Sequence, residues 1–87
     1  KNYVDITILS NLTSSKYELY YRIVNYKPSA RYVGQQINTS DWEIVPVYGS
    51  KFTKRVKNGS YIEVVEVKNS TNEISRWGRS NITDDGF

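Results

Sequence analysis

The chain has 87 residues and a formal net charge of +3, and it contains no Cys, no His and no Met. A chain of this length forms a single domain, with no room for a second domain or a buried cofactor cavity. The absence of Cys excludes a disulfide framework. Twelve Lys and Arg are balanced by nine Asp and Glu along the chain, which is weaker than the concentrated basic face of nucleic-acid-binding domains.

The apolar runs are typical of strands. Val, Ile, Tyr and Thr dominate them, and no stretch repeats with the 3.6-residue period of a helix. Residues 3–9 alternate between apolar and polar positions, which predicts a first strand with Val4, Ile6 and Ile8 on its apolar side. The polar cluster at residues 11–16 predicts a turn after it.

The second predicted strand covers residues 17–26 and separates two kinds of side chain. Alternation places three apolar or aromatic residues on one face: Leu19, Tyr21 and Ile23. It places a polar and aromatic set mostly on the other face: Glu18, Tyr20, Arg22 and Tyr26. Pro28 ends this strand because proline has no N–H to donate to a ladder.

The next two runs are predicted as edge strands. Residues 31–37 contain Gly34, and residues 42–48 are interrupted by Pro46, and both features favour the edge of a sheet. Exposed edges at these positions would also allow dimerisation by strand addition. The remaining strands are predicted at residues 51–57, 61–68 and 74–77.

The dipeptide Asn58-Gly59 separates the two longest of these later runs. It is predicted as a type I′ hairpin turn, whose two central residues both need positive φ. A two-residue loop would fix the register so that Lys54 lies opposite Glu63 and Lys51 lies opposite Glu66. A slip by one residue would lose both opposite-charge pairs.

Six or seven short strands at intervals of about 8–12 residues predict an all-β fold. The expected architecture is a small antiparallel β-sandwich or a partly open barrel. Residues 1–87 are expected to form one domain, with residues 81–87 as a flexible tail.

The chain has few side chains suited to catalysis. Without His and Cys, it lacks the common general base, the common thiol nucleophile and the best transition-metal ligands. Asp41 and Glu43 flank Trp42 and are interpreted as turn or strand-start residues, because a glycosidase needs two carboxyl groups held across a cleft. The acidic residues near the end of the chain do not match the spacing of a calcium loop. We therefore expect no enzyme activity, no metal and no cofactor.

Aromatic and basic side chains are the strongest indication of function. Aromatic residues make up 14% of the chain, and eight of them are Tyr, a ring that can lie half in water. Flat rings on a sheet can stack on sugars, on bases or on the side chains of a partner, and the alternative is that they pack across strands. The candidate binding residues are Tyr20, Arg22, Tyr26, Arg31, Tyr32, Arg76, Trp77 and Arg79.

Five Asn-X-Ser/Thr triplets fall between the predicted strands, at Asn11, Asn38, Asn58, Asn69 and Asn81. They are glycan acceptors if a eukaryotic secretory pathway made the chain, and plain turn residues in a bacterial protein. Low Ala and high Asn, Ser, Thr and Tyr favour a secreted or cell-surface location, with the cytoplasm as the alternative.

Three functions remain open. The first is a non-catalytic exported binding or adhesion domain whose aromatic and basic sheet face binds a glycan or a protein surface. The second is a small basic secreted antimicrobial or membrane-active toxin acting at an anionic lipid surface, although acidic residues interleave with the basic ones. The third is a single-stranded nucleic-acid-binding β-barrel, which the modest charge disfavours. The Cys-Trp-Cys pattern of immunoglobulin domains is absent.

Overall fold

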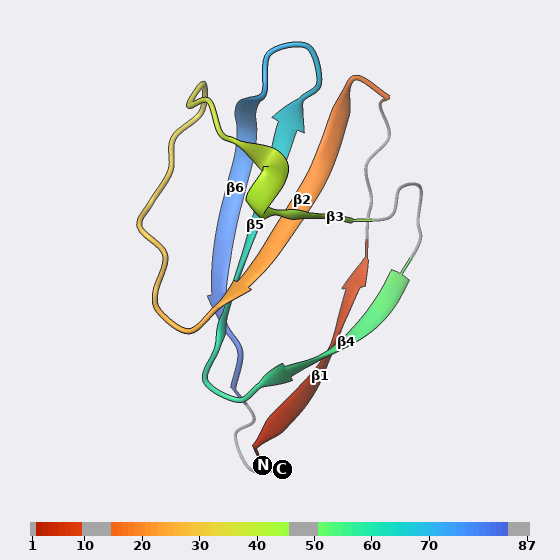
Figure 1. Ribbon diagram of the computed structural model, residues 1–87, viewed down its shortest axis with the longest axis vertical. Coiled ribbons are helices and arrows are strands. Elements are labelled where there is room, and N and C mark those ends of the chain that lie inside the picture. The colour runs from red at the N-terminus through yellow and green to blue at the C-terminus, as the bar shows by residue number, and fades with distance from the viewer. Residues whose placement is uncertain (1, 10–14, 46–50, 84–87) are drawn as a thin grey trace.

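The computed structural model describes residues 2–9, 15–45 and 51–83. In these residues six strands form two antiparallel sheets, which confirms the predicted small all-β fold (Figure 1). The strands are β1 (Tyr3–Leu9), β2 (Tyr17–Val24), β3 (Glu43–Ile44), β4 (Lys51–Lys57), β5 (Tyr61–Lys68) and β6 (Glu73–Asn81), and η1 (Thr39–Asp41) is a single 3-10 turn. The smaller sheet pairs β1 with β4, and the larger sheet has the order β3-β2-β5-β6. Among the described residues, no helix has the length and apolar character needed to cross a bilayer.

Alternation located three strands with the bounds that the structure shows, namely β1, β4 and β5. The strand β2 ends at Val24, two residues earlier than predicted, and the chain then bends ahead of Pro28. The strand β6 is longer than predicted and includes Asn81, and the next residue, Ile82, is buried. Asn81 and Ile82, which were expected to begin a flexible tail, are therefore part of the folded domain. Residues 84–87 lie outside the described part.

Of the two edge strands predicted after β2, the first does not form and the second is confirmed only as a short edge strand. Residues 31–37 form no strand, and only Gln36 makes an isolated bridge, to Glu73. The run predicted over residues 42–48 is reduced to the two residues of β3, and residues 46–48 lie outside the described part. The strand β3 pairs with β2 at the edge of the larger sheet, while the residues before it cross in front of that sheet, where Ile37 and Trp42 pack against its core (Figure 1).

The turn at Asn58-Gly59 exists, but it is not a type I′ hairpin. The strand β4 pairs with β1, and β5 pairs with β2 and β6, so the turn leads from one sheet to the other. The Ser60 N–H donates to the Lys57 carbonyl at 3.1 Å, which closes a β-turn. Only Gly59 has positive φ (+94°), which is the sign pattern of a type II turn.

The two charge pairs expected from the hairpin register are therefore wrong. Lys54 bonds to Glu43 instead of Glu63, and the backbone of Lys51 pairs with that of Leu9. The physical reason lies in β5, where buried residues alternate with half-buried ones, so both of its faces need cover. A strand of that kind belongs at the centre of a sheet, whereas β4, with four Lys or Arg in seven residues, suits an edge.

The main core lies on one face of the larger sheet. Its centre consists of Val65, Val67 and Ile74, each at most 1% exposed. Half-buried rings and one aliphatic side chain pack around this centre: Tyr20, Ile37, Trp42 and Trp77. This face also carries Tyr20 and Arg22. The segment between β2 and β3, which we call the covering segment, packs over it, so the polar and aromatic side of β2 faces inward.

The opposite face of the larger sheet is turned toward the smaller sheet. The Lys54 ammonium of β4 lies 5.6 Å from the centre of the Tyr21 ring in β2, and Tyr21 is buried. The other apolar residues on this face of β2 and β5 are only half-buried: Leu19, Ile23, Ile62 and Val64. A two-stranded sheet therefore covers this face incompletely.

Candidate functional site

A buried carboxylate organises the covered face of the larger sheet. Glu63 in β5 is 0% exposed, and its carboxylate accepts three side-chain hydrogen bonds. Arg22 Nε donates to Oε1 at 2.9 Å, while Arg31 Nε and Trp77 Nε1 donate to Oε2, the latter at 2.7 Å. Together with Trp42 and Arg79, which stack on these groups, we call these residues the Glu63 cluster.

Strand register explains why these side chains meet. Glu63 lies opposite Arg22 in β2 and opposite Arg79 in β6, and directly paired residues share a face of the sheet. Trp77 lies two residues from Arg79 in β6 and therefore projects from the same face. Arg31 enters from the covering segment between β2 and β3.

The aromatic rings lie against guanidinium groups. Arg22 Cζ is 4.8 Å and Arg31 Cζ is 5.2 Å from the centre of the Trp42 ring. Arg79 Cζ is 5.3 Å from the centre of the Trp77 ring, and its Nη1 donates to the Pro28 carbonyl at 2.6 Å. Each such contact contributes about 0.5–2 kcal/mol, with the larger values in desolvated settings. The Arg side chains are therefore held in fixed positions.

The charges in the cluster do not balance. Burial by itself raises the pKa of the Glu63 carboxyl, but hydrogen bonds from Arg31, Trp77 and Arg22 outweigh it and hold that pKa below its usual value. Glu63 is therefore ionised at neutral pH, and arginine stays protonated throughout. The cluster combines one carboxylate with three guanidinium groups: Arg22 and Arg31 bond to Glu63, and Arg79 bonds to the Pro28 carbonyl, which leaves an excess of two positive charges.

Four of the predicted binding residues belong to the Glu63 cluster: Arg22, Arg31, Trp77 and Arg79. Tyr20 lies on the same face but packs on the core, and its hydroxyl donates to Glu18 at 3.0 Å. Burial, followed by that hydrogen bond, raises the pKa of Tyr20.

The other three predicted binding residues lie elsewhere. Arg76 is on the opposite face of β6, where it pairs with Glu66 at 2.7 Å. Tyr26 and Tyr32 are 53% and 68% exposed and stand in the segment after β2. The structure thus does not gather all eight residues into one surface.

Sequence reasoning missed Glu63 as the centre of the cluster and did not assign Trp42 to it. Glu63 was expected to pair with Lys54 across the hairpin. A signal was present in β5, because Glu63 shares its alternation with Val65 and Val67, which are both buried. A charged residue in a buried row needs charged partners, and the sequence offers Arg in neighbouring runs.

The Asn-X-Ser/Thr triplets occupy different settings. Asn38 and Asn69 are exposed turn residues, but their side chains are engaged: Asn38 Oδ1 accepts from Ser40 N–H at 3.1 Å, and Asn69 Nδ2 donates to the Ser15 carbonyl at 2.8 Å. Asn81 is exposed but ends β6 instead of lying in a loop, and Asn58 is half-buried. Asn11 lies outside the described residues.

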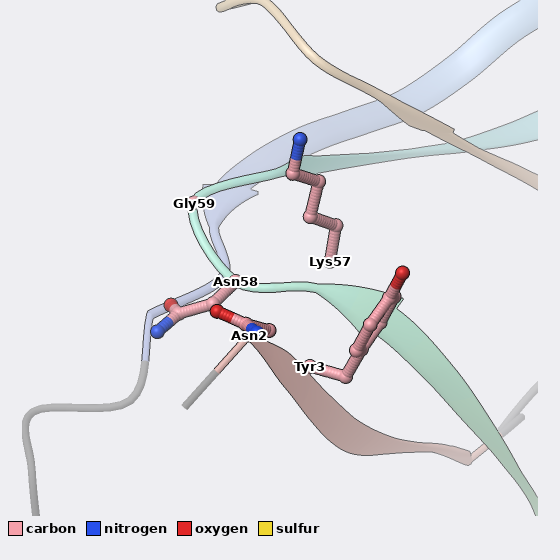
Figure 2. Close-up of a pocket in the computed structure, with 5 residues that line it drawn as sticks. All are labelled: Asn2, Tyr3, Lys57, Asn58 and Gly59. Carbon is pink, nitrogen blue, oxygen red and sulfur yellow. The ribbon is translucent and has the colours of Figure 1, made fainter.

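A shallow depression of about 340 Å³ lies beside the Asn58-Gly59 turn. Figure 2 shows its lining, which comes from the start of β1 and the end of β4: Asn2, Tyr3, Lys57, Asn58 and Gly59. It contains no carboxylate and none of the candidate binding residues.

The described residues contain no group of three or more His, Cys, Asp or Glu that could hold a metal ion. The arrangement that stands out chemically is thus the Glu63 cluster, a basic and aromatic site. No protein family, curated protein or solved structure matches this chain.

Proposed function

We propose that this chain is a non-catalytic binding domain that recognises an acidic ligand, either an acidic glycan or an acidic protein surface, through the Glu63 cluster. The observation that carries the proposal is the sharing of Glu63 by Arg22 and Arg31. Both Arg residues engage the carboxylate through Nε, and their side chains remain 25% and 20% exposed. Their terminal nitrogens are the groups that a ligand anion would meet.

The chemistry of guanidinium supports an oxyanion ligand. Its planar fork donates two parallel hydrogen bonds to a carboxylate, sulfate or phosphate group. Here Arg22 and Arg31 are already ordered by Glu63 and Trp42. Binding would therefore lose less side-chain entropy than binding to free surface Arg residues.

A comparison with the other ion pairs of the protein supports the same site. Other ion pairs among the described residues are one to one, such as Lys54–Glu43 at 3.0 Å and Arg55–Asp5 at 3.2 Å. The Glu63 cluster instead combines two Arg on one carboxylate with Arg79, which is bonded to a neutral carbonyl. An excess of charge on a rigid aromatic platform favours a specific acidic partner.

The composition supports an exported location for such a domain. Asn, Ser and Thr are concentrated in the turns, and the two rings after β2, Tyr26 and Tyr32, are exposed. A glycan or a protein outside the cell is the partner that this proposal expects.

The test compares two charge removals on the same strand. Arg79→Gln removes a charge from the Glu63 cluster, and Arg76→Gln removes one from the opposite face of β6. Affinity for heparin oligosaccharides and for polyglutamate, measured by titration calorimetry, should fall about tenfold for Arg79→Gln and less than twofold for Arg76→Gln.

Equal losses of affinity in the two variants would mean that binding depends only on the net charge of the protein, which would contradict the proposal. Binding of neutral glycans without binding of any acidic ligand would also contradict it. Tight binding of single-stranded DNA, or dye leakage from anionic vesicles, with no binding of acidic glycans or polyglutamate would favour a nucleic-acid-binding or membrane-active protein instead.

A further inference from the structure

The smaller sheet has only two strands. In the described part of the chain, β1 pairs with β4 alone and β4 pairs with β1 alone, so each strand has one edge without a ladder partner (Figure 1). Two-stranded sheets are marginally stable in water, and three or more strands are usually needed for an independent sheet. An added strand would therefore stabilise this part of the fold.

The strand edges differ in how they are protected. The sequence of β4 carries four Lys or Arg in seven residues, and charged residues of this kind discourage edge pairing. The start of β6 is bonded by the covering segment, through Gly34 N–H to the Ile74 carbonyl at 2.8 Å, and the rest of β6 carries Arg76 and Arg79. The strand β1 has a single charged residue, Asp5, in the sequence YVDITIL. Of these three strands, β1 has the least protected edge.

The apolar side of β1 is also incompletely covered. Val4, Ile6 and Ile8 are half-buried, although Val56, the partner of Val4 in β4, is buried. On the facing side of the larger sheet, Leu19, Ile62 and Val64 are likewise half-buried. A strand placed beside β1 would extend the apolar row of the smaller sheet.

The backbone shows which groups of β1 point toward an added strand. The Asn58 N–H donates to the Asn2 carbonyl at 2.9 Å, and these two residues are the next pair beyond Tyr3 and Lys57 in the β1–β4 register. Directly opposite residues that share a hydrogen bond alternate with those that do not. The even-numbered residues of β1 therefore turn their N–H and C=O toward β4, and the odd-numbered residues turn theirs outward.

We propose that the outer edge of β1 pairs antiparallel with β1 of a second copy of this chain, around a two-fold axis at Ile6. Odd residues must face odd residues, because only these have outward N–H and C=O groups, and this excludes every register shifted by one residue. An axis at Asp5 would place two carboxylates opposite each other. An axis at Ile6 avoids this contact and uses all seven residues of β1.

The resulting contacts are specific. Asp5 of one copy exchanges backbone hydrogen bonds with Thr7 of the second copy, and Ile6 lies opposite Ile6 without a hydrogen bond. Val4 lies opposite Ile8 of the second copy, so apolar side chains meet apolar side chains along the inner face. The product is a four-stranded sheet in the order β4-β1-β1-β4. This dimer is independent of the Glu63 cluster.

A single-cysteine variant tests the position of the axis, because the chain has no Cys of its own. Cα atoms in a non-hydrogen-bonded antiparallel pair are about 4.5 Å apart, within the range of a disulfide. Under mild oxidation, Ile6→Cys should form a covalent dimer in high yield. The matched control Val4→Cys should not, because the two copies of residue 4 are about 13 Å apart along the strands.

A charge series on the outer face tests the same dimer without depending on that variant. Sedimentation equilibrium should show a weaker dimer for Thr7→Asp, which faces Asp5 of the second copy, and a tighter dimer for Thr7→Lys. We expect about a threefold change in the dissociation constant for each. Thr53→Asp, at the pair position of Thr7 in β4, changes the charge equally but lies away from the seam and should leave the dimer unchanged.

Three outcomes would overturn the proposal. The first is a wild-type chain that stays monomeric at millimolar concentration. The second is a dimer whose dissociation constant responds equally to Thr7→Asp and Thr53→Asp. The third is a Val4→Cys variant that cross-links as readily as Ile6→Cys. Loss of acidic-ligand binding in the Arg79→Gln variant would not affect any of these results.

Discussion

Arg22 Nε lies 2.9 Å from Oε1 of Glu63 across the β2–β5 ladder, and the Glu63 side chain has no exposed surface. A buried carboxylate is stable only when hydrogen-bond donors and opposite charges replace the water it has lost. Here Arg22 and Arg31 supply charged donors and Trp77 a neutral one, and they come from β2, from the covering segment and from β6. This carboxylate therefore ties three separate parts of the chain together.

Neutralising Glu63 should strongly destabilise the fold. In Glu63→Gln the side chain keeps its shape, but the half-buried guanidinium groups of Arg22 and Arg31 lose their counter-ion, and we expect a loss of about 3 kcal/mol in the free energy of unfolding. Urea denaturation measures this loss. The control Glu43→Gln breaks the Lys54–Glu43 pair, whose side chains are 37% and 60% exposed, and should change stability by less than about 1 kcal/mol. Similar losses in both variants would contradict the role of Glu63.

Acid should destabilise the protein through the same residue. The folded-state pKa of Glu63 lies below its ordinary value of 4.5, so its ionised form stabilises the fold above about pH 4.5. This contribution is lost as the pH falls through the depressed pKa. The pKa values of Glu66 and Glu43 are also lowered, by hydrogen bonds from Arg76 and from Tyr21 and Lys54, and act in the same direction.

The measurement is thermal unfolding between pH 7 and pH 2, followed by tryptophan fluorescence. Glu63→Gln should show a shallower loss of stability over the acidic range than the wild-type chain. An acid profile of the same steepness in both proteins would show that Glu63 is not a principal acid-sensitive group.

The positive φ of Gly59 should make this position intolerant of a side chain. Gly59 has φ +94° with open space around it, so Gly59→Ala meets only backbone strain and should lose about 1–2 kcal/mol. Gly78 in β6 also has open space but no positive φ, and Gly78→Ala should be neutral or slightly stabilising. The free energies of unfolding of Gly59→Ala and Gly78→Ala, measured by chemical denaturation, check this difference. A turn that accepted Ala at residue 59 without loss would contradict the assigned backbone.

Core packing predicts which isoleucine contributes most to the free energy of unfolding. Ile74 is 1% exposed and lies against Val65 and Val67, so Ile74→Ala should cost about 3 kcal/mol. Ile44, on the two-residue strand β3, is 53% exposed, and Ile44→Ala should stay within about 0.5 kcal/mol of wild type. Comparable costs at both positions would place the core elsewhere.

The sequence was enough to locate β1, β4 and β5, because β1 and β5 carry apolar rows that a sheet must bury and β4 lies between two turn signals, Gly49-Ser50 and Asn58-Gly59. It could not choose the partners of these strands. Asn58-Gly59 is a strong local turn signal, yet the pairing of β5 with β2 and β6 depends on burying Val65 and Val67 between two neighbours, which is a long-range effect.

The candidate site was predicted in part for a similar reason. Arg22, Trp77 and Arg79 could be grouped as basic and aromatic residues from the sequence alone. Their shared face follows from a register that only the fold sets, and Glu63 becomes their centre only when the segment carrying Arg31 and Trp42 covers that face. The sequence predicts two edge strands in this segment, of which only the short β3 forms, and nothing local shows that the rest of the segment crosses the sheet.

The most direct test of the Glu63 cluster as a ligand site is a titration observed by ¹H–¹⁵N NMR. Arg22 Nε–H, Arg31 Nε–H and Trp77 Nε1–H all bond to Glu63, so their signals report on the cluster residue by residue. On addition of a sulfated oligosaccharide or of polyglutamate, these signals should shift in a saturable way, while the signal of Arg55 Nε–H, which bonds to Asp5 on the smaller sheet, should not. Saturable shifts confined to Arg55 and the smaller sheet would contradict the proposed site.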